Sequence, residues 1–85
     1  MNTGPMTPDR IAEMIRAGLP GATVQVESDD NTHFGARVVA TQFAGLRPIA
    51  RHQLVYKTLG ALVGREIHAL SIEALTPEEL AGRNR

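Results

Sequence analysis

The sequence contains no cysteine at any of its 85 positions. Without cysteine the chain can form neither a disulfide framework nor a thiolate metal site of its own. This composition fits a reducing compartment. It also means that any soft metal centre on this protein would need sulfur from another molecule.

The sequence also lacks an excess of either charge, because nine basic residues balance nine acidic ones. A dedicated nucleic-acid binder usually carries a net basic face. No apolar run is long enough for a membrane span, and the first residues lack the apolar stretch of a signal peptide. We therefore expect a cytoplasmic protein without a membrane partner.

The chain length allows one domain, expected at 7–80, with a flexible leader at 1–6 and a flexible tail at 81–85. A chain of this size buries roughly 60 to 65% of its unfolded surface, which leaves little room for a deep cleft. Ser28 and Ser71 have no local activating motif, and Glu78 and Glu79 are explained by helix capping. The sequence therefore predicts a partner-binding surface and no enzymatic activity.

The periodicity of apolar residues predicts six elements. A helix is expected from Thr7–Pro8 to about Gly18, and a longer amphipathic helix runs from Pro48 to Gly64. The apolar stripe of the second helix includes Ile49, His52, Val55, Tyr56 and Leu59. Strands are predicted at 22–28, 33–41 and 66–74, and a capping box at 76–79 opens a last short helix.

This order, αββαβα, predicts an α+β fold with a three-stranded mixed sheet and helices on one face. The first two strands form an antiparallel hairpin, whereas the second and third are joined through a helix and are therefore parallel. Parallel neighbours start at the same end of the sheet. His33 and His68 are therefore expected near each other, beside the 29–32 turn.

Six segments of the sequence together resemble the signature of BolA-like proteins. They are His33-Phe34, Val38-Val39, Phe43-Ala44-Gly45, Arg51-His52-Gln53-Leu54-Val55-Tyr56, Ile67-His68-Ala69-Leu70-Ser71 and Thr76-Pro77-Glu78-Glu79. Each segment is weak alone, but the ordered set is specific, and the resemblance covers nearly the whole chain from Thr7 to Leu80. The resemblance implies a fold related to class II KH domains.

The resemblance also implies a function in complex with a monothiol glutaredoxin. In that complex a histidine matching His68 ligates a bridging 2Fe-2S cluster. The family places a further ligand, histidine or cysteine, in the loop between strands one and two, where this chain offers only His33. The remaining thiolates would come from the glutaredoxin and glutathione, so we expect no cluster on the isolated chain, which would be a monomer or weak homodimer.

Each histidine also has a structural interpretation. Without the resemblance, we would expect His68 to be a half-buried histidine hydrogen-bonded to backbone groups, because isolated histidines are seldom metal ligands. The resemblance favours His68 as a cluster ligand. His33 is either a ligand or a residue that hydrogen-bonds the turn, Asp30 is an alternative oxygen ligand, and His52 is expected to be structural. The predicted partner-binding residues around the histidines are Asp30, Asn31, Thr32, Ile67 and Ala69.

A second hypothesis is a DNA-binding regulator of stress response and cell morphology, a role that the resemblance also includes. Its surface would use the basic residues around the second helix: Arg47, Arg51, Lys57 and Arg65. Arg51 and Lys57 are six residues apart and do not share one helical face cleanly. Around this helix the glycines do not form the Gly-x-x-Gly loop of KH modules, because Gly60 and Gly64 are four apart and Gly45 is followed at the matching place by Pro48. Solvated surface charges are therefore the favoured interpretation.

Overall fold

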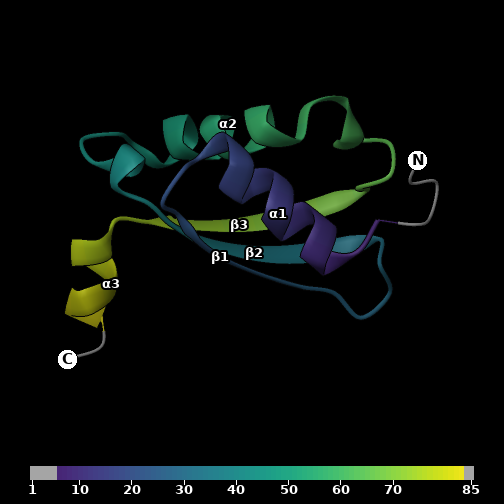
Figure 1. Ribbon diagram of the computed structural model, residues 1–85, viewed down its shortest axis with the longest axis horizontal. Coiled ribbons are helices and arrows are strands. Elements are labelled where there is room, and N and C mark those ends of the chain that lie inside the picture. Colours follow the sequence, from purple (N-terminus) through teal and green to yellow (C-terminus); the bar gives the residue numbers. More distant parts are fainter. Residues whose placement is uncertain (1–5, 84–85) are drawn as a thin grey trace.

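The computed structural model describes residues 6–83, which form a three-stranded sheet with helices (Figure 1). The helices are α1 (Pro8–Gly18), α2 (Pro48–Leu59) and α3 (Pro77–Arg83), and the strands are β1 (Thr23–Glu27), β2 (His33–Val39) and β3 (Ala69–Leu75). Two short 3₁₀ helices, η1 (Thr41–Phe43) and η2 (Gly60–Leu62), flank α2. The predicted α+β order is therefore confirmed. No helix among the described residues has the length and apolar character to span a membrane.

The sheet has the strand order β1-β2-β3, with β2 in the centre. β1 and β2 pair antiparallel, with Val24 opposite Val38, and β2 and β3 pair parallel, with His33 opposite Ala69. The helices α1 and α2 cover one face of this sheet, and the opposite face carries neither (Figure 1). α3 departs from the prediction of helices on one face, since it lies beyond the end of β3.

The core lies between the sheet and the two covering helices. β2 contributes Phe34, Ala36 and Val38, and α1 contributes Ile11 and Ile15, all buried. The predicted alternation of β2 and the predicted stripe of α1 both hold, because a strand buries every second residue and a helix buries residues four apart. Burying these apolar side chains is the main favourable contribution to folding.

The start of α1 is fixed by its cap and by the residue before it. The Thr7 hydroxyl accepts the backbone N–H of Arg10 at 3.3 Å, and Pro8 occupies the first turn. Met6 is only 3% exposed and belongs to the core cluster. The prediction of a flexible leader is therefore wrong at Met6, which packs as a core residue, while residues 1–5 lie outside the described part of the chain.

The strands β1 and β2 end within two residues of the predicted boundaries, and three other boundaries shift further. α2 ends at Leu59 and not at Gly64, because Gly60 takes a φ of 59° that only glycine adopts readily. β3 begins at Ala69, three residues later than predicted, because an isolated bridge joins Val63 to Ile67 before the strand. α3 continues to Arg83, so most of the predicted tail is helical, and residues 84–85 are not described.

Two residues of the predicted apolar stripe of α2 are exposed. Ile49 is 70% exposed and Tyr56 is 38% exposed, whereas Val55 and Leu59 are fully buried. The buried stripe of α2 is therefore narrower than the predicted one. Val55 and Leu59 are four residues apart and therefore face the core together, whereas Ile49 and Tyr56 lie on the flank of the helix beside them.

α1 lies close against α2 at Gly18. A Cβ atom at position 18 would lie 2.5 Å from Cγ2 of Thr58 and 2.9 Å from its Cβ. The Thr58 side chain is itself fixed, because its hydroxyl donates to the Val55 carbonyl at 2.6 Å. Position 18 therefore requires glycine because a larger side chain would clash with Thr58. The backbone conformation there does not itself require glycine.

The substitution Gly18→Ala should destabilise the protein by about 1 kcal/mol or more, because overpacking costs about 1 to 3 kcal/mol. The gain in helix propensity offsets less than about 1 kcal/mol of this cost. Urea unfolding followed by circular dichroism measures the change. In a Thr58→Ser background, which removes the nearest methyl group, the cost should shrink. A Gly18→Ala variant as stable as the parent would contradict the close contact.

Arg51 joins α2 to the end of β3 and to α3. Its guanidinium donates to both carboxylate oxygens of Glu79, at 2.7 and 3.1 Å, and to the carbonyls of Leu46 and Ala74. The predicted capping box is confirmed, since Thr76 N–H donates to Glu79 and Glu79 N–H donates to the Thr76 hydroxyl. Glu79 thus serves the cap of α3 and the ion pair with Arg51 at once.

This arrangement makes the stability of the fold depend on the charge of Glu79. Hydrogen bonds from Arg51 and then from Thr76 N–H lower the pKa of Glu79 from 4.5 to about 2. Because the folded pKa lies below the unfolded one, the carboxylate stabilises the fold above about pH 4.5, and this contribution disappears as the pH falls toward 2.

Glu79→Gln should therefore lower the melting temperature near neutral pH, and the difference from the parent should shrink as the pH falls from 4.5 to 2. Thermal unfolding monitored by circular dichroism across this range measures it. Glu78→Gln is the matched control, because it removes a carboxylate from the same helical turn. A difference that stays constant with pH would show that the ion pair with Arg51 contributes no stability.

Candidate functional site

The turn between β1 and β2 is held by its own side chains. Oδ1 of Asp30 accepts the backbone N–H groups of Thr32 and His33, each at 2.9 Å. The Ser28 hydroxyl donates to the His33 carbonyl at 2.6 Å and accepts the backbone N–H of Asn31 at 2.9 Å. Asn31 adopts a positive φ of 56°, which asparagine tolerates better than most residues. The turn therefore presents His33 from a defined backbone.

The His33 ring is oriented by a carboxylate. Its Nδ1 lies 2.8 Å from Oδ2 of Asp30, and the two side chains are 68% and 52% exposed. Hydrogen bonds from His33 N–H, from the His33 ring and from Thr32 N–H hold the pKa of Asp30 well below its usual range. An ionised Asp30 fixes the proton on Nδ1, so Nε2 is the nitrogen left to accept a metal or a hydrogen bond.

His68 lies one residue before β3 and is exposed. Its backbone N–H donates to the Thr32 carbonyl at 3.3 Å, and the Ala69 N–H donates to the same oxygen at 3.4 Å. Ile67, directly before it, is fully buried and anchors the segment. His68 therefore lies beside the start of β2. His33 is paired with Ala69, the residue that follows His68 in the chain.

The predicted proximity of the two histidines is therefore present at the level of the backbone. A shallow hollow of about 320 Å³ lies beside His33, and its lining consists of Glu27, Ser28, Asp29, His33 and Gly35. Within residues 6–83 no group of three or more histidine, aspartate or glutamate side chains is arranged to hold a metal ion. The ligand roles of His33 and His68 stay predictions.

The predicted partner-binding residues divide into two groups. Asp30, Asn31 and Ala69 are exposed and Thr32 is half-buried, so a partner could reach them. The prediction for Ile67 is wrong, because its side chain is fully buried in the core. The bridge between Val63 and Ile67 turns this residue inward, a local pairing that strand alternation alone does not predict.

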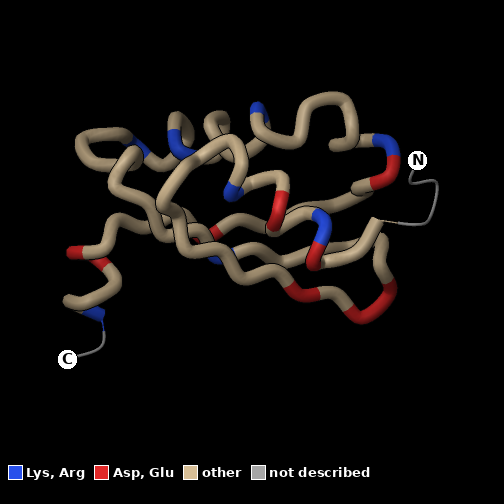
Figure 2. Tube along the Cα trace, in the orientation of Figure 1, with Lys and Arg blue, Asp and Glu red and all other residues tan. Residues whose placement is uncertain are grey.

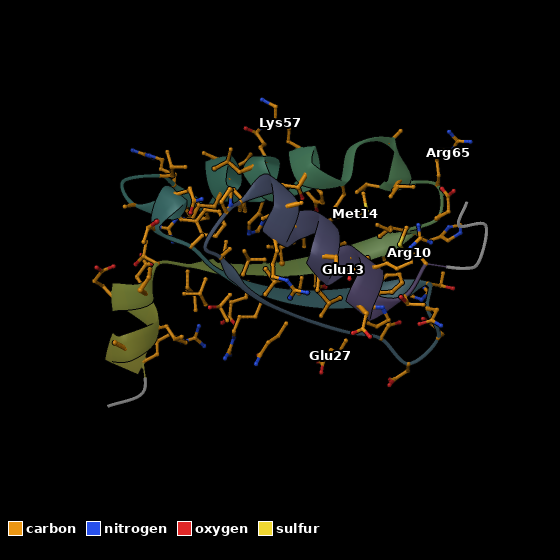
Figure 3. All side chains as sticks on the ribbon, viewed as in Figure 1. Arg10, Glu13, Met14, Glu27, Lys57 and Arg65 are labelled. Atoms are coloured by element: carbon orange, nitrogen blue, oxygen red, sulfur yellow. The ribbon has the colours of Figure 1, made fainter. Side chains whose placement is uncertain are left out.

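The prediction of a basic surface on α2 is wrong for Arg51. Only 11% of its side chain is exposed, and its guanidinium carries the bonds to Glu79 and two carbonyls while lying 5.9 Å from the Phe43 ring centroid. Arg47, Lys57 and Arg65 are exposed. Figure 3 shows Lys57 on α2, pointing away from the sheet, and Arg65 apart from it in the loop between η2 and β3.

Acidic residues surround the histidine end of the sheet. Figure 2 shows acidic residues at the end of β1, in the β1–β2 turn and in the loop before β3. They are Glu27, Asp29, Asp30 and Glu66, and Arg65 directly precedes Glu66. The structural role of Arg51 is not evident from the sequence. Arg51 and Glu79 are 28 residues apart, and nothing in the local pattern of either segment marks them as a pair.

Comparisons with known proteins agree on one family. The model of the family described as BolA-like protein matches residues 17–79. A protein of the rpoN-murA intergenic region of Acinetobacter guillouiae is 39% identical over 75 residues, which are 87% of this chain and 89% of that protein. The chain is similar to a solved BolA homologue from Coxiella burnetii, with a TM-score of 0.80, 38% identity and coverage of 89% and 97% of the two chains.

A further relative is longer than this chain. The DNA-binding transcriptional regulator BolA of Vibrio cholerae is 46% identical over 54 residues, which are 64% of this chain and only 51% of that protein. The chain thus matches about half of the length of this relative. The family model covers most of the chain and the solved homologue shares its sheet and helices. This protein therefore belongs to the BolA-like family.

Proposed function

We propose that this chain is an adaptor that binds a monothiol glutaredoxin and ligates a shared 2Fe-2S cluster through His68, with His33 as the second imidazole. The observation that supports the proposal most is the β2–β3 register, in which His33 pairs with Ala69 and the His68 N–H donates to the Thr32 carbonyl. Both histidines are exposed at this end of the sheet.

The set of donor atoms fits a shared cluster better than a resident one. A 2Fe-2S cluster takes four ligands, and histidine replaces cysteine only in part. The chain has three histidines and no cysteine. His52 lies on α2, whereas His33 begins β2 and His68 directly precedes β3. Thiolates from a glutaredoxin cysteine and from glutathione would complete the set, and the cluster is then cargo held between two proteins.

Asp30 supports this proposal as a positioning residue and not as an alternative ligand. Its Oδ1 already accepts two backbone N–H groups, and its Oδ2 accepts from the His33 ring. A carboxylate that holds the Nδ1 proton of a histidine orients Nε2 and raises its basicity, as in many metal sites. The exposed residues Asn31 and Ala69, beside the two histidines, would then form the contact surface for the glutaredoxin.

The proposal is tested by mixing the protein with a cluster-loaded monothiol glutaredoxin and recording visible absorption and circular dichroism. The parent chain should change the cluster spectrum, because imidazole replaces a ligand of the glutaredoxin-bound cluster. His68→Ala should abolish this change, and His33→Ala should weaken it. An unchanged spectrum on mixing the parent chain would refute the proposal.

The matched control is His52→Ala, which removes the third histidine, a half-buried residue of α2. This variant should give the spectrum of the parent complex. Far-ultraviolet circular dichroism of each variant alone verifies that the fold is intact. If His68→Ala retained the parent spectrum while folded, His68 would not be a ligand.

A second candidate function is DNA binding, which is favoured by the name of the Vibrio cholerae relative. Its surface on this chain would use Arg47, Lys57 and Arg65, the exposed members of the predicted basic set. The acidic residues around the histidine end would repel phosphates there, so DNA would have to approach from α2.

Under this second candidate, Lys57→Glu should weaken binding to duplex DNA at all sequences alike, and the salt dependence of log K should fall by about one unit for the phosphate contact that is lost. Fluorescence anisotropy in a salt series measures both quantities. Glu13→Gln on α1, a charge change away from α2, is the control. DNA affinity that is equal for the parent and Lys57→Glu would contradict this candidate.

A further inference from the structure

β3 is an edge strand, and no strand within residues 6–83 lies on its outer side. The sheet order is β1-β2-β3, so β3 pairs with β2 alone (Figure 1). The Ala69 N–H donates to the Thr32 carbonyl and the Leu75 carbonyl accepts from the Ala40 N–H, so these two residues direct their backbone groups toward β2. Because backbone direction alternates along a strand, the groups of Leu70, Ile72 and Ala74 face outward.

One of these outward groups is already occupied. The Ala74 carbonyl accepts from Nη1 of Arg51 at 3.1 Å, which covers the C-terminal end of the edge. Among the hydrogen bonds of residues 6–83, none involves the outward N–H and C=O groups of Leu70 and Ile72. Such groups form a template for another strand, since an edge that is not covered or charged invites pairing.

The two edges of the sheet differ in this respect. β1 has five residues and ends in the charged Glu27, which points away from the helices in Figure 3. β3 has seven residues, and its segment 69–72 carries no charge. Short, charged edges discourage pairing and longer uncharged ones permit it. The side chains of Leu70 and Ile72 are also only partly buried, so a further strand would cover them.

We infer that β3 pairs antiparallel with β3 of a second copy of this chain, about a twofold axis at Ser71. This register sets Leu70 opposite the partner's Ile72, so that each pair exchanges two N–H···O bonds through groups that are otherwise without a protein partner. The two apolar side chains of each pair then cover one another on the helix side of the sheet.

The neighbouring twofold registers are less favourable. An axis at Ile72 would need the Ala74 carbonyl, which Arg51 occupies. An axis at Glu73 would set Glu73 against the partner's Glu73, and like charges directly opposite are destabilising. Of these three registers, the axis at Ser71 is the one whose central hydrogen bonds use the unoccupied groups of Leu70 and Ile72 and which sets no two like charges opposite each other.

The pairing is weak and transient, because two short strands bury less area than the roughly 1,600 Å² of a standard interface. It also has a consequence for the histidine end. In this register the partner's Ala74 lies opposite His68, so the second copy crowds the imidazole. Self-pairing and the proposed sharing of a cluster therefore exclude one another on the same chain.

Cysteine cross-linking tests the register, because the natural chain contains no cysteine. The two Ser71 residues form a non-hydrogen-bonded pair with Cα atoms about 4.5 Å apart. A disulfide fits a Cα separation of about 4.4 to 6.8 Å. Ser71→Cys, exposed to glutathione disulfide, should therefore form a covalent dimer on non-reducing gels.

The matched control is Gln25→Cys, an exposed position on the other edge strand. Ser71→Cys should cross-link about tenfold faster or more, because pairing raises the effective concentration of its thiols above that of chance encounters. Equal rates for the two variants would overturn the inference.

A second measurement does not depend on cysteine. In sedimentation velocity over a concentration series, the parent chain should show a concentration-dependent dimer, and Ser71→Arg should shift the equilibrium to monomer by placing like charges across the axis. Gln25→Arg should leave the equilibrium unchanged. A parent chain that stays monomeric throughout the series, or a dimer insensitive to Ser71→Arg, would overturn the inference.

Discussion

The parallel pairing of β2 with β3 is the constraint on which the candidate site depends. Parallel strands start at the same end of a sheet, so residues that are 35 positions apart, His33 and His68, become neighbours there. Val38 lies opposite Ala74 within this pairing and is fully buried, so the register is held by the core. A slip of one residue would turn the buried side chains of one strand to the other face of the sheet and would shift His68 relative to His33.

The turn and the end of β3 are fixed by different means. At the histidine end, Ser28 and Asp30 organise the backbone with exposed hydrogen bonds, which leaves the surface accessible. At the opposite end, Arg51 is nearly buried and joins α2, β3 and α3 through Glu79 and two carbonyls. The charge of Arg51 therefore stabilises the fold. The carboxylate of Asp30, by contrast, orients the His33 ring through Nδ1.

The outer edge of β3 adds a second interaction surface that shares a boundary with the first. His68 comes immediately before the strand whose outward backbone groups are open, so one segment contributes both to the histidine end and to the edge. A small domain has little surface to divide among partners. Competition between neighbouring surfaces on one strand would couple self-association to the binding of another protein.

The sequence by itself determined the order of elements, the alternation of β2, the cap of α3 and the neighbourhood of the two histidines, because each follows from local periodicity or from strand direction. Only the tertiary structure decided the inward turn of Ile67, the structural role of Arg51, the exposure of Ile49 and the burial of Met6. These outcomes depend on which elements meet in space, and contacts between distant segments leave no signature in the local pattern of either one.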